Sequence, residues 1–294
     1  MQTMVPLYGF GGGSGGTGAT LTVTAPAGAT VTVSKDGKSK TKVADLDGVA
    51  VFKGLSSGDW LLSITDGTQT AQKTVTITAD YTAAITFFSA TIHVRYPAGS
   101  TCTATDGTTT LTAPDTSGTW DCVVLNAGTW TFGYNGHAID SVEITENGET
   151  SLALPLYLYK SGEGPVFPMH SDGKTSVNIS IGTDRIGITY TVARYAMSCV
   201  RNENAVDISK YNTLCARVNC TSNRLDPEYK GRLFVSEKAL VAEDVSSGSL
   251  GLTLLTENST ATVYSVDVST ITDKMVYFGV HGAWMGDIYD IWLE

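Results

Sequence analysis

Residues 19–31 read ATLTVTAPAGATV, and residues 90–102 read ATIHVRYPAGSTC. Both stretches place an Ala-Thr-hydrophobic start, a Pro-Ala-Gly turn and a Thr-containing end at the same spacing. Farther along, Gly58-Asp59-Trp60 corresponds to Gly128-Thr129-Trp130, which places Trp60 and Trp130 at equivalent positions. Self-similarity of this kind indicates that one structural unit has been duplicated.

Each copy has the pattern of short β-strands. Runs such as Val31-Thr32-Val33 and Trp60-Leu61-Leu62-Ser63-Ile64 have the alternation and the residue types of half-buried strands. Asp-Gly and Asn-Gly pairs separate the runs and accept the positive φ angles of tight hairpin turns. We therefore predict a β-sandwich of about seven short strands per copy. The turn pairs are Asp36-Gly37, Asp47-Gly48, Asp66-Gly67, Asp106-Gly107, Asn135-Gly136 and Asn147-Gly148.

A known module resembles the first copy. Residues 26–31 (PAGATV), 45–55 (DLDGVAVFKGL) and 58–60 (GDW) are together similar to PEGA and carboxypeptidase-regulatory-like domains. The resemblance implies Ig-like or prealbumin-like sandwiches that serve as spacers and adhesive modules, and it implies no catalytic residues. In the second copy, residues 115–120 (DTSGTW) replace the Asp-Leu-Asp-Gly turn, so the assignment there depends on the internal repeat.

The C-terminal region continues the strand pattern without the repeat. Alternating runs such as 177–181 (VNISI) and 276–280 (VYFGV) recur through residues 166–294. Roughly eight such runs predict a jelly roll or a related antiparallel sandwich. Residues 206–214 (VDISKYNTL) and 288–293 (IYDIWL) resemble strands of carbohydrate-binding-module-like jelly rolls, which implies a sugar ligand for this region.

These patterns predict an all-β protein with two tandem Ig-like/prealbumin-like β-sandwich repeats followed by a C-terminal jelly-roll β-sandwich. The predicted parts are a flexible glycine-rich N-terminal anchoring arm (1–18), the first repeat (19–88), the second repeat (89–160) and the C-terminal jelly roll (166–294).

Composition excludes several classes of partner. The formal net charge of -10 disfavours nucleic acid, because binding to a phosphate backbone requires clustered Lys and Arg. The sequence lacks an apolar run of about 18 residues, so we expect no membrane insertion. The start MQTMVPLYGF lacks the basic and apolar regions of a signal peptide, so we expect no export by such a signal.

Chemistry beyond binding has little support in the sequence. Cys102, Cys122, Cys199, Cys215 and Cys220 form no CxxC pair and no Cys/His ligand spacing, so we predict no metal and no cofactor. We expect free, buried thiols, and a Cys102–Cys122 disulfide is the alternative. The sequence also places no two carboxylates at a glycosidase separation, so we predict no catalytic residues and no enzymatic activity.

The candidate ligand-binding residues are aromatic and polar. The stretch 281–287 (HGAWMGD) places Trp284 near glycines, and we predict a loop that presents this ring to a sugar, with His281 and Asp287 beside it. The alternative is a Trp that packs back over an edge of the sandwich or over an interface. Tyr211 and Tyr229 are further candidates.

A glycine-rich arm, Ig-like spacers and a sugar-binding type of jelly roll together resemble bacteriophage virion accessory proteins, such as tail, baseplate or head fibres. The resemblance implies a virion protein, present as a homo-oligomer or in many copies, whose arm binds other virion proteins and whose C-terminal domain contacts host-surface polysaccharide. Two alternatives stay open: a decoration or tail component with protein contacts only, and a carbohydrate-binding adhesin at a bacterial cell surface.

Overall fold

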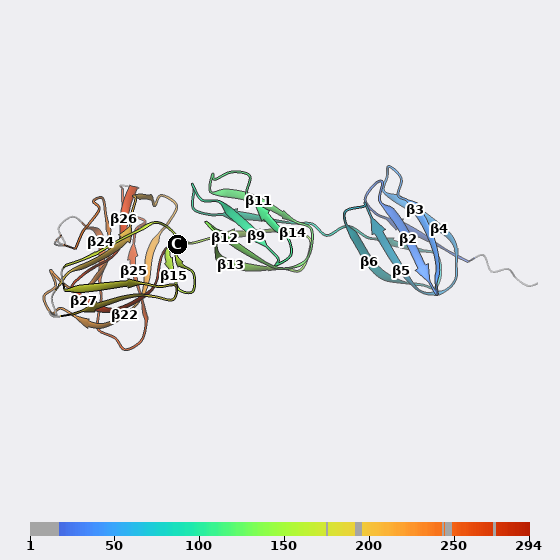
Figure 1. Ribbon diagram of the computed structural model, residues 1–294. Helices are drawn as coiled ribbons and strands as arrows, with labels where there is room; N and C mark the ends of the chain where they lie inside the picture. The colour runs from blue at the N-terminus through green and yellow to red at the C-terminus, as the bar shows by residue number, and fades with distance from the viewer. Residues whose placement is uncertain (1–17, 175, 192–195, 243, 245–248, 273–274) are drawn as a thin grey trace, which may run out of the picture. The chain divides into compact units, whose positions relative to one another are not determined.

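The computed structural model describes residues 18–174, 176–191, 196–242, 244, 249–272 and 275–294. Within these residues every regular element is a β-strand, and the strands form paired sheets (Figure 1). The predicted all-β sandwich fold is confirmed. No helix in this part of the chain is long and apolar enough to cross a membrane. The predicted N-terminal arm lies almost entirely outside the described residues.

The first sandwich contains strands β1 to β7. They are β1 (Ala19–Thr24), β2 (Thr30–Lys35), β3 (Lys38–Val43), β4 (Val49–Leu55), β5 (Gly58–Thr65), β6 (Thr70–Ile77) and β7 (Tyr81–Ala84). One sheet has the order β4-β1-β7 and the other β3-β2-β5-β6. Val31 and Val33 of β2 are buried, whereas Thr30 and Thr32, which alternate with them, are partly exposed, as a strand with one face on the core requires. Trp60 belongs to this core.

The second sandwich repeats this arrangement. Its strands are β8 (Ala90–Arg95), β9 (Cys102–Thr105), β10 (Thr110–Thr112), β11 (Thr119–Val124), β12 (Gly128–Tyr134), β13 (His137–Ile144) and β14 (Gly148–Ala153). The sheet orders β11-β8-β14 and β10-β9-β12-β13 match those of the first sandwich strand for strand. Gly28 and Gly99 occupy the equivalent Pro-Ala-Gly turns of the two copies and have φ of 79° and 84°. The duplication inferred from the sequence is therefore visible in the topology and in the turns.

The C-terminal sandwich has two larger sheets. One has the order β16-β15-β27-β19-β18, with β22 and β25 joined to it through β27, and the other has the order β17-β20-β26-β23-β24, with β21 beside β26. The strands are β15 (Leu156–Lys160), β16 (Gly164–Pro165), β17 (Met169–Gly173), β18 (Val177–Ile181), β19 (Ile186–Tyr190), β20 (Ser198–Asn202), β21 (Val206–Asp207), β22 (Thr213–Asn223), β23 (Arg232–Ser236), β24 (Ser249–Leu254), β25 (Thr262–Asp267), β26 (Met275–Gly282) and β27 (Trp284–Leu293).

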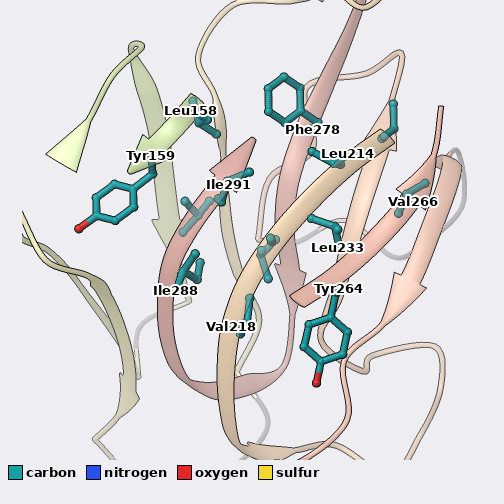
Figure 2. Packing of buried hydrophobic residues seen from close by; sticks show 14 of the residues in the cluster. Leu158, Tyr159, Leu214, Val218, Leu233, Tyr264, Val266, Phe278, Ile288 and Ile291 are labelled. Atoms are coloured by element: carbon teal, nitrogen blue, oxygen red, sulfur yellow. The ribbon is translucent and has the colours of Figure 1, made fainter. Parts of the chain in front are cut away.

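Aliphatic and aromatic side chains from both sheets fill the space between them (Figure 2). Leu158, Ile288 and Ile291 come from one sheet, and Leu233 and Phe278 come from the other. All five are essentially inaccessible to solvent. Burial on this scale is the main favourable term in folding of the C-terminal sandwich.

One element lies differently from the prediction. Residues 156–160 were assigned to the second repeat, but β15 pairs antiparallel with β27, with Leu156 opposite Leu293. The C-terminal sheet therefore begins before residue 166. The reason is that the apolar run around Leu158 pairs with a strand from the far end of the chain, which local sequence does not reveal.

The second and C-terminal sandwiches belong to one compact unit, whereas the first sandwich belongs to another. Tyr134 connects the two sandwiches of that unit: its hydroxyl donates to the carbonyl of Pro155 at 2.7 Å and accepts from the amide of Tyr157 at 2.8 Å. The ring of Phe167 lies 5.8 Å from that of Tyr134. Lys160 donates to the carbonyls of Ala138 and Ile139. These contacts fix both sides of the cavity described next.

Candidate functional site

A cavity of about 410 Å³ lies at the junction of the second and C-terminal sandwiches. The turn after β8 forms one wall, and the segment between β20 and β22 forms the other. The lining includes Tyr96, Pro97, Ala98, Leu156, Phe167, Pro168, Asn202, Asn204, Asp207, Ser209, Lys210, Tyr211 and Met275. Small-molecule sites of about 300–1,000 Å³ with apolar walls and a few polar groups are typical of proteins.

Tyr211 is the sequence-predicted residue that lines this cavity. It lies in a tight turn ahead of β22, in which its amide donates to the carbonyl of Ile208 at 3.0 Å. Asp207 caps the same turn by accepting from the amide of Ser209 at 2.8 Å, as the Asp-x-Ser pattern favours. Burial raises the pKa of Tyr211 to about 12, so its hydroxyl is neutral and able to donate at physiological pH.

Two other lining residues are held rigidly. Tyr96 is buried, and its hydroxyl donates to the carbonyl of Asp115 at 2.8 Å. Asn202 donates to the carbonyl of Val276 and accepts from the amide of Phe278 at 2.7 Å, so its side chain is committed to β26. The polar side chains that face solvent at the rim are those of Asn204, Asp207, Ser209 and Lys210. The cavity thus combines fixed walls with an accessible polar rim.

A smaller cavity of about 90 Å³ adjoins the first and shares Tyr96, Lys210 and Tyr211 with it. Arg95 and Glu294 are the other charged residues that line it. Among the described residues, no group of three or more His, Cys, Asp or Glu side chains is placed to hold a metal ion. The chemistry that this junction offers is therefore aromatic contact, hydrogen bonding and charge.

The predicted loop at 281–287 is wrong. His281 lies within strand β26, next to its last residue, and Trp284 begins β27; their exposed fractions are 0% and 1%. The glycines serve close strand packing instead: a Cβ on Gly282 would lie 2.5 Å from the carbonyl oxygen of Lys230, and one on Gly286 would lie 1.8 Å from that of Asn219. Trp284 therefore presents no aromatic face to solvent.

His281 belongs to a polar row that crosses four strands, in the order Asp172, Cys199, His281, Arg232. Residues 240–242 cover this row: the Cys199 thiol donates to the carbonyl of Leu240 at 3.3 Å, His281 Nε2 contacts the carbonyl of Val241 at 3.2 Å, and Asp172 accepts from the amide of Ala242 at 2.9 Å. Burial and the neighbouring Arg232 lower the pKa of His281. These polar groups hold the covering segment in place.

The remaining predicted residues lie apart from the cavity. Asp287 pairs with Arg185, with 3.5 Å between carboxylate and guanidinium. The ring of Tyr229 stacks under the guanidinium of Arg224 at 4.5 Å. The structure therefore does not bring the five predicted residues together, and Tyr211 is the one that reaches the junction.

Sequence reasoning missed Tyr96, although the repeat contained a signal. The first copy has Thr24-Ala25 before its Pro-Ala-Gly turn, whereas the second has Arg95-Tyr96. Because the two copies are otherwise similar, the change from two small side chains to two large ones indicates that residues 95 and 96 have a role that residues 24 and 25 lack. Both residues line the junction.

All five cysteines are free and buried, as expected, and the alternative Cys102–Cys122 disulfide is not formed. Burial raises the pKa of Cys102 to about 11 and that of Cys122 to about 12. Both thiols are therefore protonated and unreactive in the folded protein.

No model of a protein family matches the sequence, and no curated protein does. Solved structures give weak similarities. A β-sandwich carbohydrate-binding module described for promiscuous specificity matches with a TM-score of 0.31 and 11% identity, over 81% of this chain and 90% of that one. GBS52, the minor pilin of Streptococcus agalactiae, matches with a TM-score of 0.30 and 11% identity, over 46% of this chain and 94% of that one. Such low scores carry no argument about function.

Proposed function

We propose that this chain is a non-catalytic saccharide-binding adhesion protein whose ligand occupies the junction cavity. The observation that carries the proposal is the cavity itself, in which Tyr211 and Phe167 provide aromatic surface. A polar rim is provided by Asn204, Asp207, Ser209 and Lys210. A sugar ring has an apolar C–H face and a hydroxylated edge. Aromatic faces attract the first, and rim donors and acceptors satisfy the second.

The tandem sandwiches support a spacer role within this proposal. Single sugar contacts are weak, but many copies on one surface raise the effective concentration of the sites and produce stable attachment. The finer assignment is a bacteriophage virion fibre or receptor-binding protein that contacts other virion proteins and host-surface polysaccharide. A bacterial cell-surface adhesin is the alternative location. Mass spectrometry of purified phage particles and of cell-surface fractions separates the two.

The test of the ligand is a glycan array probed with the whole chain, followed by titration calorimetry of the best glycan. We expect Tyr211→Ala to weaken binding about tenfold, which corresponds to roughly 1.4 kcal/mol, because an aromatic contact contributes about that much. Tyr81→Ala is the matched control, since Tyr81 is a 46% exposed tyrosine on β7 of the first sandwich.

Two results would reject the proposal. Absence of binding to any glycan, even with the chain displayed multivalently, would favour a structural component that makes only protein contacts. Equal binding by Tyr211→Ala and by the unmodified chain would place any glycan site elsewhere on the molecule.

A further inference from the structure

The two junction cavities are adjacent and share three residues, which raises the question of what the smaller one accepts. Its volume of about 90 Å³ has room for a few water-sized groups but not for a second sugar ring. A substituent that projects from a ring in the larger cavity would fit. The charges around the smaller cavity indicate which kind of substituent.

Arg95 and Lys210 are the cations that line the smaller cavity. Both residues are exposed, and neither side chain forms an ion pair with any described residue. Free cations at a cavity are notable in a chain with a formal net charge of -10. Arg95 also replaces the Thr24 of the first repeat, so its charge is specific to the copy that borders the junction.

Glu294 is the carboxylate that lines the same cavity, and each of its carboxylate oxygens has a contact within the C-terminal sandwich. Oε2 accepts from the indole N–H of Trp292 at 2.9 Å, and Oε1 lies 3.8 Å from the thiol of Cys215. Its main-chain oxygen accepts from the amides of Asn212 and Thr213 at 2.8 and 3.0 Å. Glu294 thus contacts residues of β22 and β27 and forms no ion pair with Arg95 or Lys210, so both cations are available to a ligand.

Tyr211 connects the two cavities. This residue lines both, and the positive charge of Arg95 opposes the rise in the pKa of Tyr211 that burial causes, whereas Asp207 adds to that rise. A ring packed on Tyr211 in the larger cavity would therefore project its substituent toward Arg95 and Lys210.

We infer that the ligand is an acidic saccharide, with a sugar ring in the larger cavity and a carboxylate, phosphate or sulfate substituent between Arg95 and Lys210 in the smaller one. This inference rests on the proposed function and deepens it. Guanidinium groups bind planar and tetrahedral oxyanions through paired N–H donors, and the Lys210 ammonium adds a mobile point charge.

The experiment uses the whole chain and an array that carries each acidic oligosaccharide beside its carboxyl-reduced, dephosphorylated or desulfated counterpart. We expect the acidic member of a pair to bind more tightly. Arg95→Gln and Lys210→Gln should each weaken that binding roughly two- to fivefold, the range of exposed ion pairs, and leave the neutral member unchanged. Raising the salt concentration should reduce the preference. Lys38→Gln, on an exposed edge strand of the first sandwich, is the control.

The outcomes separate the inference from the proposed function. Equal binding of acidic and neutral members overturns the inference, and so does a preference for the acidic member that persists in the Arg95→Gln/Lys210→Gln double variant. In either case, weaker binding by Tyr211→Ala would still support saccharide binding in the larger cavity. Loss of all glycan binding in the unmodified chain overturns both. Because both side chains are exposed, the variants should keep the melting temperature of the parent chain, which a thermal scan checks.

Discussion

Trp284→Ala distinguishes a core tryptophan from a presented one. The ring is 1% exposed, and a Cβ on Gly231 would lie 2.7 Å from its Cγ, so the indole packs directly against the main chain at Gly231. Truncation of such a ring costs about 3–5 kcal/mol through lost burial and the cavity left behind. At about 2–4 °C per kcal/mol for a unit of this size, the C-terminal transition should fall by roughly 6–20 °C in differential scanning calorimetry.

Two matched variants make the test sharper. Trp284→Phe should cost less than about 2 kcal/mol, because the indole N–H has no hydrogen-bond partner among the described residues and only part of the ring volume is lost. Trp292→Ala changes a half-buried tryptophan of the same strand, stacked on Tyr157 at 5.9 Å, and should also cost less than Trp284→Ala. An unchanged melting temperature for Trp284→Ala, combined with lost glycan binding, would refute the assignment of Trp284 to the core.

Three further predictions follow from local geometry. His93 lies 2.8 Å from Asp121 and 3.5 Å from Glu149, and hydrogen bonds to these carboxylates raise its pKa, so an NMR titration should place that pKa above 6.5. The stabilisation that protonated His93 gives the fold should be present below pH 6.5 and should disappear as the pH rises through the folded-state pKa. Cys102, with its pKa raised to about 11, should react with an alkylating reagent at pH 8 only after unfolding, and rapid labelling of the native protein would contradict its burial. Gly286→Ala should lower the melting temperature of the C-terminal sandwich, because its φ of 146° and the carbonyl of Asn219 leave no place for a Cβ; a neutral substitution would show that β22 and β27 separate easily.

The sandwiches and their duplication could be predicted because the information is local. Asp36-Gly37 and Asn135-Gly136 are adjacent pairs with an intrinsic tolerance for positive φ, and both form the expected hairpins. Strand alternation around Val31 likewise depends on near neighbours alone. Because the two copies carry similar residues at equivalent positions, the strands assigned in one copy support the strands assigned in the other.

The candidate site could not be predicted in the same way. The cavity wall combines Tyr96 with Tyr211, which are far apart in the sequence and meet only through the junction. The glycines around Trp284 suggested a loop, because sequence alone cannot distinguish a glycine that turns the chain from one that admits a neighbouring backbone. What decides between them is a neighbouring carbonyl, that of Lys230 or Asn219, from a segment that is distant in the sequence.

The pairing of β15 with β27 joins residues that follow the second sandwich to the last strand of the sheet. During synthesis on the ribosome, β15 emerges before β27, so the backbone groups of β15 that pair with β27 stay unpaired until β27 has been made. A fragment that starts at residue 166 would leave the edge of β27 around Ile291 open, and an open apolar edge invites pairing with other copies and aggregation. Production of the C-terminal sandwich by itself should therefore begin no later than Leu156, and the second sandwich should be retained where the junction is to be studied.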